Sequence, residues 1–243
     1  MKFENTEVWG FEHSLRGMRN PLNSWHRSDS GTNYDCMNGC REDCPHLNMD
    51  CDEEYCDEFR IGQNDMKLAQ TLIKAGNEHR KFMRQIFVSV DITAPLYWWK
   101  EYDTYKVGTV ANSTSTMHKL ATTPITLDCF EIDDYDRNLS LADNLKNDNE
   151  LNHISVFEED VIMVLESLRQ KYLETKDKRY WKELIRWLPE SWLQKRTITM
   201  SYENIRNMYF QRKNHKLTEW SESFIKWVES LPYAEELIMY EGE

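Results

Sequence analysis

The sequence predicts an α+β fold, because two strand-like runs stand among several amphipathic helical segments. Short apolar runs at residues 6–11 and 86–93 are typical of strands. After Ser155, apolar residues such as Val161, Leu165 and Leu168 recur every three or four positions, which is the period of a half-buried helix. Apolar residues make up 40% of the 243 residues, so the chain can bury a sizeable core as one large domain or two small ones.

The other elements are predicted from their start and stop signals. A helix begins at Asn64 or Asp65, whose side chains can accept the first unpaired amide hydrogens, and it ends at Ala75 because Gly76 permits a left-handed turn. Before it, residues 12–30 read as a loop with glycine and proline breakers. Later helices are predicted over 156–174, 178–188, 202–213 and 218–230, with Ser201 as a favourable N-cap of the third. The last of these is expected to bury Trp220, Phe224, Trp227 and Leu231.

Charge and hydropathy exclude several classes of partner. The net charge is −12 and the pI is about 5.1, whereas binding of polymeric nucleic acid needs a basic surface. No apolar stretch reaches 18 residues, so no membrane span is expected. The first residues lack the basic start and apolar run of a signal peptide. We therefore expect a cytoplasmic protein with reduced thiols.

Residues 31–60 have a composition of their own, rich in acidic residues and nearly free of aliphatic ones. Such a segment buries little of itself, which indicates a long loop or an insertion held by a metal. Zinc prefers four nitrogen or sulfur ligands in a tetrahedral arrangement, and the spacing here forms loose knuckles. The candidate metal ligands are Cys36, Cys40, Cys44, Cys51 and Cys56. Free thiols or occasional disulfides in a loop are the alternative, and a metal-binding interaction protein is a third reading of the whole chain.

The segment 92–118 is the most informative part of the chain. An apolar run ends at Ala94-Pro95, an aromatic and charged segment follows, and small hydroxyl and amide residues then gather around Asn112 and Ser115. Small polar side chains let a backbone approach a ligand closely and offer many donors. By itself the segment is either an anion-binding loop or a plain polar loop.

With its neighbours, this segment resembles the core of the flavin-dependent thymidylate synthases. That family has an apolar strand ending in Ala-Pro, followed by the signature Arg-His-Arg-x-x-Ser-x-Asn-x-x-Ser-x-Arg. Here Thr104-Tyr105-Lys106 stands at the Arg-His-Arg position, and Thr109 takes the place of the first serine. Asn112 and Ser115 match after an insertion of one residue, and Met117 replaces the last arginine. Only Lys106 keeps a charge.

The resemblance returns downstream and covers about 82–229 in all. Leu188-Pro189 is similar to the family's Leu-Pro, and 199–212 is similar to its Thr-x-Asn-x-x-x-Leu-x-Asn-Phe-x-x-x-Arg helix, with Ser201 in place of an asparagine. In the family, asparagines of this helix touch the flavin nucleotide and the terminal arginine reads the substrate. The resemblance therefore gives these roles to Asn207 and Arg212.

The resemblance implies a single domain over 1–243 with a central antiparallel sheet, assembled as a homotetramer. It implies FAD as cofactor, NADPH as reductant, methylenetetrahydrofolate as methylene donor, and dUMP or a related pyrimidine deoxynucleotide as substrate. A catalytically altered nucleotide-binding or structural relative is the alternative. The cofactor-binding residues carried over are Tyr105, Lys106, Thr109, Asn112, Ser201 and Asn207. The substrate-binding residues are Lys100, Glu101, Ser113, Ser115, Thr116 and Arg212.

No catalytic nucleophile is assigned, because in this family the flavin carries the reducing chemistry and the protein supplies positioning. The missing arginines leave fewer cations for the flavin phosphates. Cations near enough in sequence to compensate are Lys100, Arg80, Lys81, Arg84 and Lys119. Tyr97, Trp98, Trp99 and Tyr105 are candidates for stacking on a ring of the ligand, with packing in the core as the alternative for the tryptophans.

Overall fold

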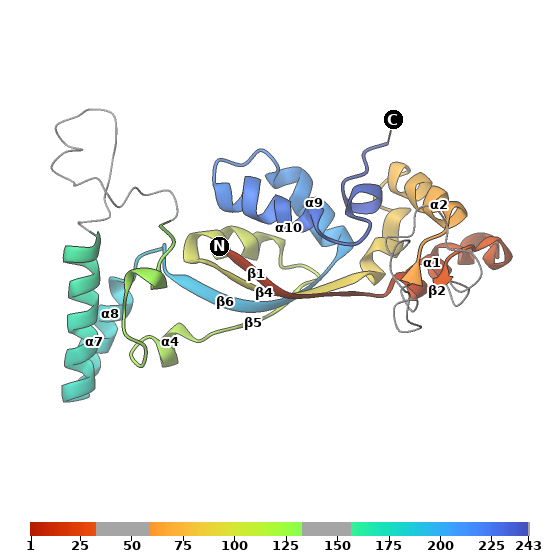
Figure 1. The fold of residues 1–243 in the computed structure, drawn as a ribbon. Coiled ribbons are helices and arrows are strands. Elements are labelled where there is room, and N and C mark those ends of the chain that lie inside the picture. The colour runs from red at the N-terminus through yellow and green to blue at the C-terminus, as the bar shows by residue number, and fades with distance from the viewer. Residues whose placement is uncertain (33–58, 133–156, 243) are drawn as a thin grey trace, which may run out of the picture. The chain divides into compact units, whose positions relative to one another are not determined.

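A computed structural model describes residues 1–32, 59–132 and 157–242, and its fold is α+β (Figure 1). The central feature is an antiparallel sheet of four strands in the order β1-β4-β6-β5. These strands are β1 (Lys2–Trp9), β4 (Phe87–Pro95), β6 (Leu193–Ser201) and β5 (Val110–Ser113). A second, antiparallel pair joins β2 (Gly31–Thr32) to β3 (Phe59–Arg60).

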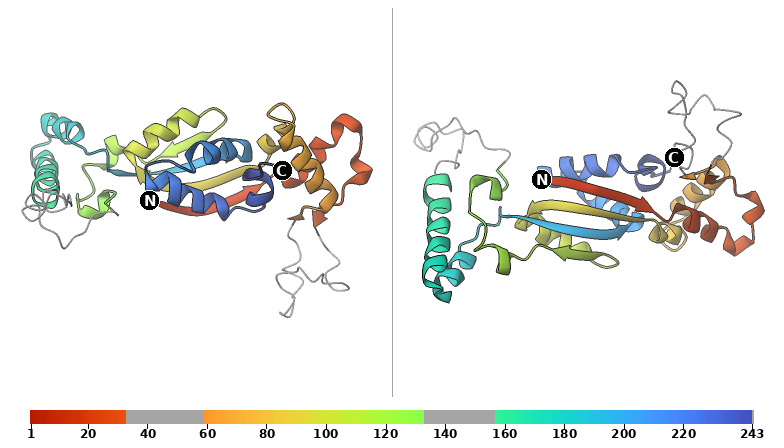
Figure 2. Two further views of the ribbon diagram at one scale, coloured as in Figure 1. Left: turned by 90° about the horizontal axis from the view of Figure 1, so that it is seen from above. Right: turned by 60° about the horizontal axis from the view of Figure 1, so that its bottom comes forward.

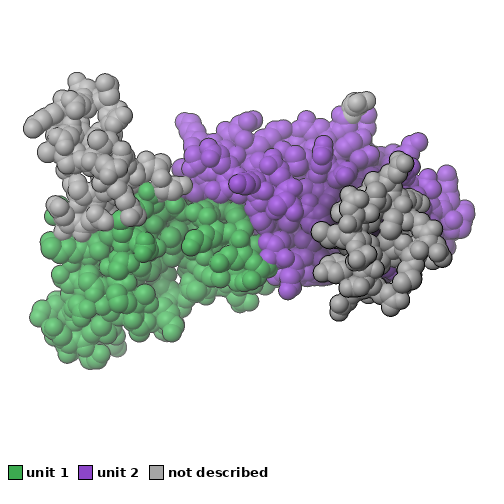
Figure 3. Space-filling model, viewed as in Figure 1, with its two compact units in different colours: residues 1–5, 90–198 green, residues 6–89, 199–243 purple. Residues whose placement is uncertain are grey.

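The described chain forms two compact units, coloured separately in Figure 3. Unit 1 contains residues 1–5 and 90–198, and unit 2 contains residues 6–89 and 199–243. Strands β1, β4 and β6 each contribute residues to both units. The expectation of one domain over 1–243 stays a prediction.

Unit 1 has a core of large aromatic rings and a second, smaller apolar cluster. Trp98, Trp99 and Tyr102 are at most 1% exposed and contact one another with ring centroids 4.8–5.4 Å apart. The smaller cluster consists of Leu120, Ile125, Phe130, Leu165 and Leu184. The helical elements are α3 (Leu96–Tyr102), η6 (Asp103–Tyr105), α4 (Thr116–Lys119), η7 (Leu127–Cys129), η8 (Phe157–Ile162), α7 (Met163–Thr175) and α8 (Lys178–Arg186). Helices α7 and α8 lie side by side in both views of Figure 2.

Unit 2 is built mainly from helices around an apolar core. Trp220, Phe224, Trp227 and Leu231 are all buried, as predicted. The helical elements are α1 (Phe11–Met18), η1 (Asn20–Leu22), η2 (Trp25–Arg27), α2 (Gln63–Lys74), η5 (Arg80–Gln85), α9 (Tyr202–Arg212), η9 (Glu219–Phe224), α10 (Ile225–Glu229) and η10 (Ala234–Ile238). Among the described residues, no helix is both long and apolar enough to cross a membrane.

The first predicted strand ends earlier than expected, and a helix replaces the predicted loop after it. Strand β1 stops at Trp9 and α1 begins at Phe11, because Gly10 adopts a φ of +96° between them. A Cβ atom at Gly10 would lie 2.2 Å from the carbonyl oxygen of Gln85, so the close approach also requires glycine. Leu15 and Met18 are buried, and their packing stabilises α1 although Gly17 is a poor helix former.

The start of α2 corrects another prediction, whereas its end agrees with the sequence. Gly62, not Asn64 or Asp65, is the N-cap residue. The side chain of Asp29 caps this helix instead, accepting from the backbone N–H groups of Asn64 and Asp65 at 2.9 and 3.1 Å. A carboxylate at a helix N-terminus is favoured by the exposed amides there. At the other end, Gly76 adopts the predicted left-handed conformation with a φ of +103°.

Candidate functional site

The signature-like residues of unit 1 form a tight turn between α3 and β5. Gly108 adopts a φ of +79°, and Thr109 donates its backbone N–H and its hydroxyl to the carbonyl oxygen of Lys106 at 3.1 and 3.0 Å. Tyr105 is half-buried, while the side chain of Lys106 is exposed. Three of the predicted cofactor residues therefore share one turn, with the Lys106 ammonium at the surface.

Strand β5 and helix α4 carry the hydroxyl and amide residues of the signature. Asn112 and Ser113 lie on β5, which is exposed along its whole length. The Ser115 hydroxyl accepts a hydrogen bond from the backbone N–H of His118 at 3.2 Å and so caps α4. The Gln194 side-chain amide donates to the carbonyl oxygen of Thr114 at 2.9 Å. The sequence did not predict that Ser115 caps α4.

A cavity of about 680 Å³ in unit 1 brings two of the predicted substrate residues together. Ser115 and Thr116 line it, and Lys119 contributes a cation. The remaining polar groups of the lining are Lys2, Glu4, Thr93, Thr114, Thr123, Asp128, Cys129 and Glu131. Lys100, Glu101 and Ser113 do not line this cavity. The predicted substrate residues of unit 1 therefore do not all meet at one place.

The three predicted residues of unit 2 lie on helix α9. Ser201 is its N-cap, as predicted, and forms a reciprocal capping box with Asn204. Asn207 is half-buried in the middle of the helix. Arg212 ends the helix and places its guanidinium 5.1 Å from the ring centroid of Trp220. Their roles toward a cofactor or substrate stay predictions.

The five cations that were candidates for replacing the missing arginines differ in whether they already have a protein partner or line a cavity. Lys100 pairs with Glu190 at 2.5 Å, and Arg80 pairs with Glu203 at 2.9 Å. Arg84 donates to the Asn77 side chain at 3.2 Å. In contrast, Lys81 lines a cavity of unit 2 and Lys119 lines the cavity of unit 1. Lys81 and Lys119 are therefore the two that face space large enough for a ligand.

Core packing, not ligand stacking, explains the tryptophans of α3. The Trp99 indole N–H donates to the carbonyl oxygen of Gln194 at 2.9 Å, and the Arg196 guanidinium lies 4.2 Å from its ring centroid. Burial raises the pKa of the neighbouring Tyr102 to about 12, while a hydrogen bond with Thr109 acts in the opposite direction. These rings pack α3 into the core of unit 1, whereas the other two candidate rings, Tyr97 and Tyr105, are half-buried.

Unit 2 contains a larger cavity, of about 1260 Å³, whose other walls the sequence did not predict. Its lining comes from α1, the η1–η2 turns, α2 and the η5 segment. Four cationic side chains line it against the single carboxylate of Glu78: Arg19, Arg27, Lys67 and Lys81. Asn20, Asn64, His26, His79 and Gln85 add polar atoms. Ligand cavities are commonly of about 300–1,000 Å³ with a few placed polar groups, so this cavity is large enough for a dinucleotide.

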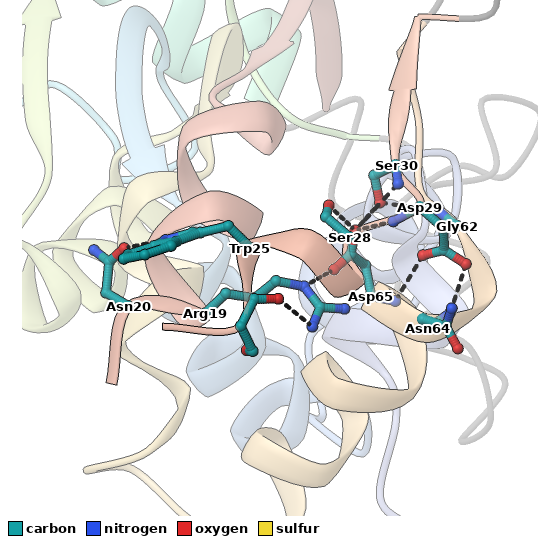
Figure 4. Close-up of polar contacts among 10 residues, drawn as sticks. Arg19, Asn20, Trp25, Ser28, Asp29, Ser30, Gly62, Asn64 and Asp65 are labelled. Carbon is teal, nitrogen blue, oxygen red and sulfur yellow. Dashed lines mark hydrogen bonds and ion pairs between the residues drawn. The ribbon is translucent and has the colours of Figure 1, made fainter. Parts of the chain in front are cut away.

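Asp65 fixes Arg19, a lining residue of this cavity, through a network of hydrogen bonds (Figure 4). Its Oδ1 accepts from Nε of Arg19 at 2.5 Å, and its Oδ2 accepts from the hydroxyls of Ser28 and Ser30, each at 2.6 Å. Burial raises the pKa of the Asp65 carboxyl, but the hydrogen bonds from Ser28, Ser30 and Arg19 outweigh it, so that the pKa is lowered overall. Asp65 is therefore a buried carboxylate that holds Arg19 in one orientation.

The predicted metal ligands Cys36, Cys40, Cys44, Cys51 and Cys56 lie outside the described residues. Within the described ranges, Cys129 is a free, half-buried thiol. No group of three or more potential metal ligands occurs in those ranges. The zinc site stays a prediction.

Comparison with known proteins identifies the fold. Two solved structures of the flavin-dependent thymidylate synthase ThyX from Helicobacter pylori, both with FAD and dUMP, are similar to this chain. One covers 99% of this chain and 98% of its own at 14% identity and a TM-score of 0.61. The other covers 98% and 96% at 14% identity and a TM-score of 0.60. The chain has the fold of a flavin-dependent thymidylate synthase.

The flavin-dependent thymidylate synthase fold confirms both the predicted resemblance and the α+β class. No model of a protein family matches the sequence, and no curated protein matches it either. At 14% identity the two chains share a fold although most of their side chains differ. The similarity spans nearly the whole chain, whereas the motifs predicted it over 82–229.

The sequence analysis considered Arg19 and Asp65 separately and did not predict the ion pair between them. Arg19 lies in a segment rich in Arg, Asn and Ser that is weakly similar to an Arg/Ser segment near the flavin site of the family, with a solvated loop as the alternative, and Asp65 reads as a helix cap. The residues are 46 positions apart and both are at most 4% exposed. One signal was available: the run Ser28-Asp29-Ser30 offers hydroxyl and carboxylate groups at the spacing of a turn that can cap a helix.

Proposed function

We propose that this protein is a flavin-dependent enzyme that acts on a pyrimidine deoxynucleotide, dUMP or a related compound, in a reductive methylation. The observation that carries the proposal is the similarity over nearly the whole chain to a ThyX structure that contains FAD and dUMP. The cofactor-binding residues proposed are those of the Tyr105–Asn112 turn in unit 1 and, separately, Asn207 of helix α9 in unit 2. Ser115 and Thr116 in the unit 1 cavity are proposed to bind the substrate, and the resemblance gives the same role to Arg212 of unit 2.

The residues of this chain fit a phosphate-containing dinucleotide. The unit 2 cavity has sufficient volume and four cations, and phosphate oxygens bind to cations through charge-assisted hydrogen bonds. FAD would supply the reducing chemistry when bound, and NADPH and methylenetetrahydrofolate are the proposed reductant and methylene donor. The chain would then contribute positioning and charge, in keeping with the absence of an assigned nucleophile. The proposed homotetramer is a further expectation of the same resemblance.

A catalytically altered relative that binds a nucleotide or flavin is the second candidate. It is favoured by a specific observation, the replacement of the signature's cationic and imidazole groups by Thr104, Tyr105 and Met117. Each lost charge-assisted hydrogen bond is worth about 1.5–3 kcal/mol. Two such losses weaken binding by about two to four orders of magnitude unless other cations replace them.

The two candidates are separated by flavin content and reactivity. For the enzyme, purified protein should be yellow, should lose its flavin absorbance on anaerobic addition of NADPH, and should convert dUMP when methylenetetrahydrofolate is present. For the altered relative, the protein should bind FAD or dUMP, measured as an increase in melting temperature, without turnover. A colourless protein that neither FAD nor dUMP stabilises would contradict both candidates.

A further inference from the structure

Helix α8 of unit 1 carries a row of cations that the proposed function does not use. Lys178, Lys182 and Arg186 stand four residues apart, so they share one face and are about 6 Å apart along the helix axis. All three residues are exposed. Arg186 pairs with Glu183, whereas Lys178 and Lys182 form no ion pair with another described residue. The face therefore presents regularly spaced positive charge to the solvent.

The charge of this chain is unevenly distributed, and the α7–α8 hairpin is basic. The whole chain has a net charge of −12, whereas residues 163–187 contain seven Lys and Arg residues and four Asp and Glu residues. An acidic protein repels polyanions in general, but a local group of cations attracts them. The net charge disfavours polymeric nucleic acid for the chain as a whole, yet this hairpin has the basic surface that such a partner needs.

An exposed tryptophan lies beside the cations. Trp187 directly follows the last residue of α8 and is 67% exposed. Its indole N–H donates to one carboxylate oxygen of Glu183 at 3.2 Å, and the other oxygen accepts from the guanidinium of Arg186. Glu183 therefore orients both the ring and the neighbouring cation. An aromatic ring that is oriented in advance loses little conformational entropy when a base stacks on it.

The other parts of α8 hold this surface in a defined shape. Leu184 is fully buried in the smaller apolar cluster of unit 1, and α8 lies beside α7 in both views of Figure 2. Asp177 caps the helix by accepting from the backbone N–H of Arg179 at 2.9 Å, and it also accepts from Nη2 of Arg179 at 2.6 Å. Arg179 stands eight residues before Trp187, so it shares a face with the indole. The row of cations and the exposed ring thus belong to one packed helix.

We propose that the exposed face of α8 binds single-stranded nucleic acid, with Lys178, Lys182 and Arg186 on the phosphates and Trp187 stacked on a base. Cations that follow the backbone and aromatic rings that stack on bases are the two parts of sequence-tolerant binding to single strands. An acidic peptide would pair with the cations but would give the indole no base to stack on. The inference goes beyond the proposed function and does not depend on it, because no residue of α8 lines the unit 1 cavity.

The first test compares two double variants that remove equal charge. Lys178→Ala/Lys182→Ala removes the two unpaired lysines of the row, and Lys216→Ala/Lys226→Ala removes two exposed lysines of unit 2 as the control. Binding of a fluorescent oligothymidylate of about 16 nucleotides to the full chain is followed by anisotropy. The α8 variant should bind about tenfold more weakly, and the control should stay within about twofold of wild type. Between about 50 and 200 mM salt, the slope of log K against log salt should be smaller by about 1.4 in the α8 variant.

The second test concerns the ring. Trp187→Ala should weaken binding of the oligothymidylate about fivefold to 100-fold without changing the salt slope, because it removes stacking and no charge. Trp187→Phe keeps an aromatic face and should retain most of the affinity. Thermal unfolding checks that each variant is folded, as expected for an exposed position. A duplex of the same length, whose bases are already stacked, should bind more weakly than the single strand.

The remaining outcomes would overturn the inference and leave the proposed function as it stands. Equal affinities of wild type, the α8 variant and the control would show that the row does not bind phosphates. Displacement of the oligothymidylate by excess dUMP would place it in a nucleotide site instead. Polyglutamate that binds as tightly as the oligothymidylate, with both unaffected by Trp187→Ala, would make an acidic peptide the partner.

Discussion

Each of the two units contains a buried arginine held by a carboxylate, yet the two guanidinium groups are used differently. In unit 1, Arg169 donates Nε and Nη2 to Glu166 at 2.7 and 2.5 Å and Nη1 to the carbonyl oxygen of Ala121 at 3.2 Å. All three of its nitrogens thus have protein partners. In unit 2, Arg19 leaves Nη2 without a partner among the described residues and faces a cavity.

The difference shows how a structural arginine can be told from one that is available to a ligand. Glu166 also accepts from the backbone N–H of Ile125 at 2.9 Å, so the Arg169 pair fixes the 121–125 segment to α7. A cation whose donors are all used in this way stabilises a loop. A buried cation with donors left over is costly unless something else binds them, and the lining of the cavity makes an anion the natural partner.

The largest expected effect is the loss of the carboxylate in unit 2. Asp65→Ala leaves Arg19 buried without its counterion, and removing one partner of a buried pair costs about 3–5 kcal/mol. Urea unfolding followed by circular dichroism should show this decrease in the free energy of unfolding. Glu174→Ala, which breaks the exposed Lys171–Glu174 pair, is the control and should change little. An equally small change in both variants would show that Asp65 does not hold Arg19.

A smaller effect is expected for the carboxylate in unit 1, and it should depend on pH. Hydrogen bonding to Arg169 lowers the pKa of Glu166 from 4.5 to about 2, despite opposing burial. Because the folded-state pKa is lowered, the stabilisation is present above pH 4.5 and is lost as the pH falls toward 2. Glu166→Gln should therefore reduce stability at pH 7 by about 1–3 kcal/mol.

The pH dependence supplies the check on Glu166. The free energies of unfolding of wild type and Glu166→Gln, measured from pH 7 to pH 2, should converge between pH 4.5 and 2 because the variant has no carboxyl group to protonate there. Parallel curves across this range would contradict the assignment. Leaving Asp65 intact in both proteins keeps the contribution of unit 2 the same.

The smallest effect concerns a predicted cofactor residue whose hydroxyl already serves the protein. Ser201 caps α9, and its replacement by alanine should cost about 1 kcal/mol of stability. Since that hydroxyl is engaged with Asn204, we expect FAD affinity to change by less than about twofold. Ser113→Ala, at an exposed position of β5, should leave stability unchanged. A large loss of FAD affinity in Ser201→Ala with little loss of stability would instead make Ser201 a cofactor ligand.

Much of the secondary structure could be predicted because local signals decide it. Strand β4 alternates buried and half-buried residues, α8 stops before Pro189, and α9 begins after its Ser201 cap. The prediction failed where local signals were weak. Helix α3 (Leu96–Tyr102) follows Pro95 in a segment that was predicted to be a loop. Strand β6 (Leu193–Ser201) contains Lys195 and Arg196, and these charges interrupt the apolar pattern that predicts a strand.

The candidate site could be predicted only in part. The motif skeleton identified the family fold and the segments 104–116 and 201–212. It did not show that Ser115 serves as a helix cap, or that Arg80 and Lys100 are already paired. The hydrogen-bond and ion-pair partners of these residues are distant in sequence or depend on the folded backbone. Composition and motif spacing therefore do not predict them.

By itself, the sequence determined the fold class, the positions of most helices and the resemblance to a flavin-dependent enzyme. Those properties follow from periodicity, caps and motif spacing, which act over a few residues. Only the tertiary structure decided which cations remain available, because burial and pairing depend on residues brought together across the chain. Arg19 became a candidate anchor through Asp65, 46 positions away, and through a cavity that no local pattern encodes.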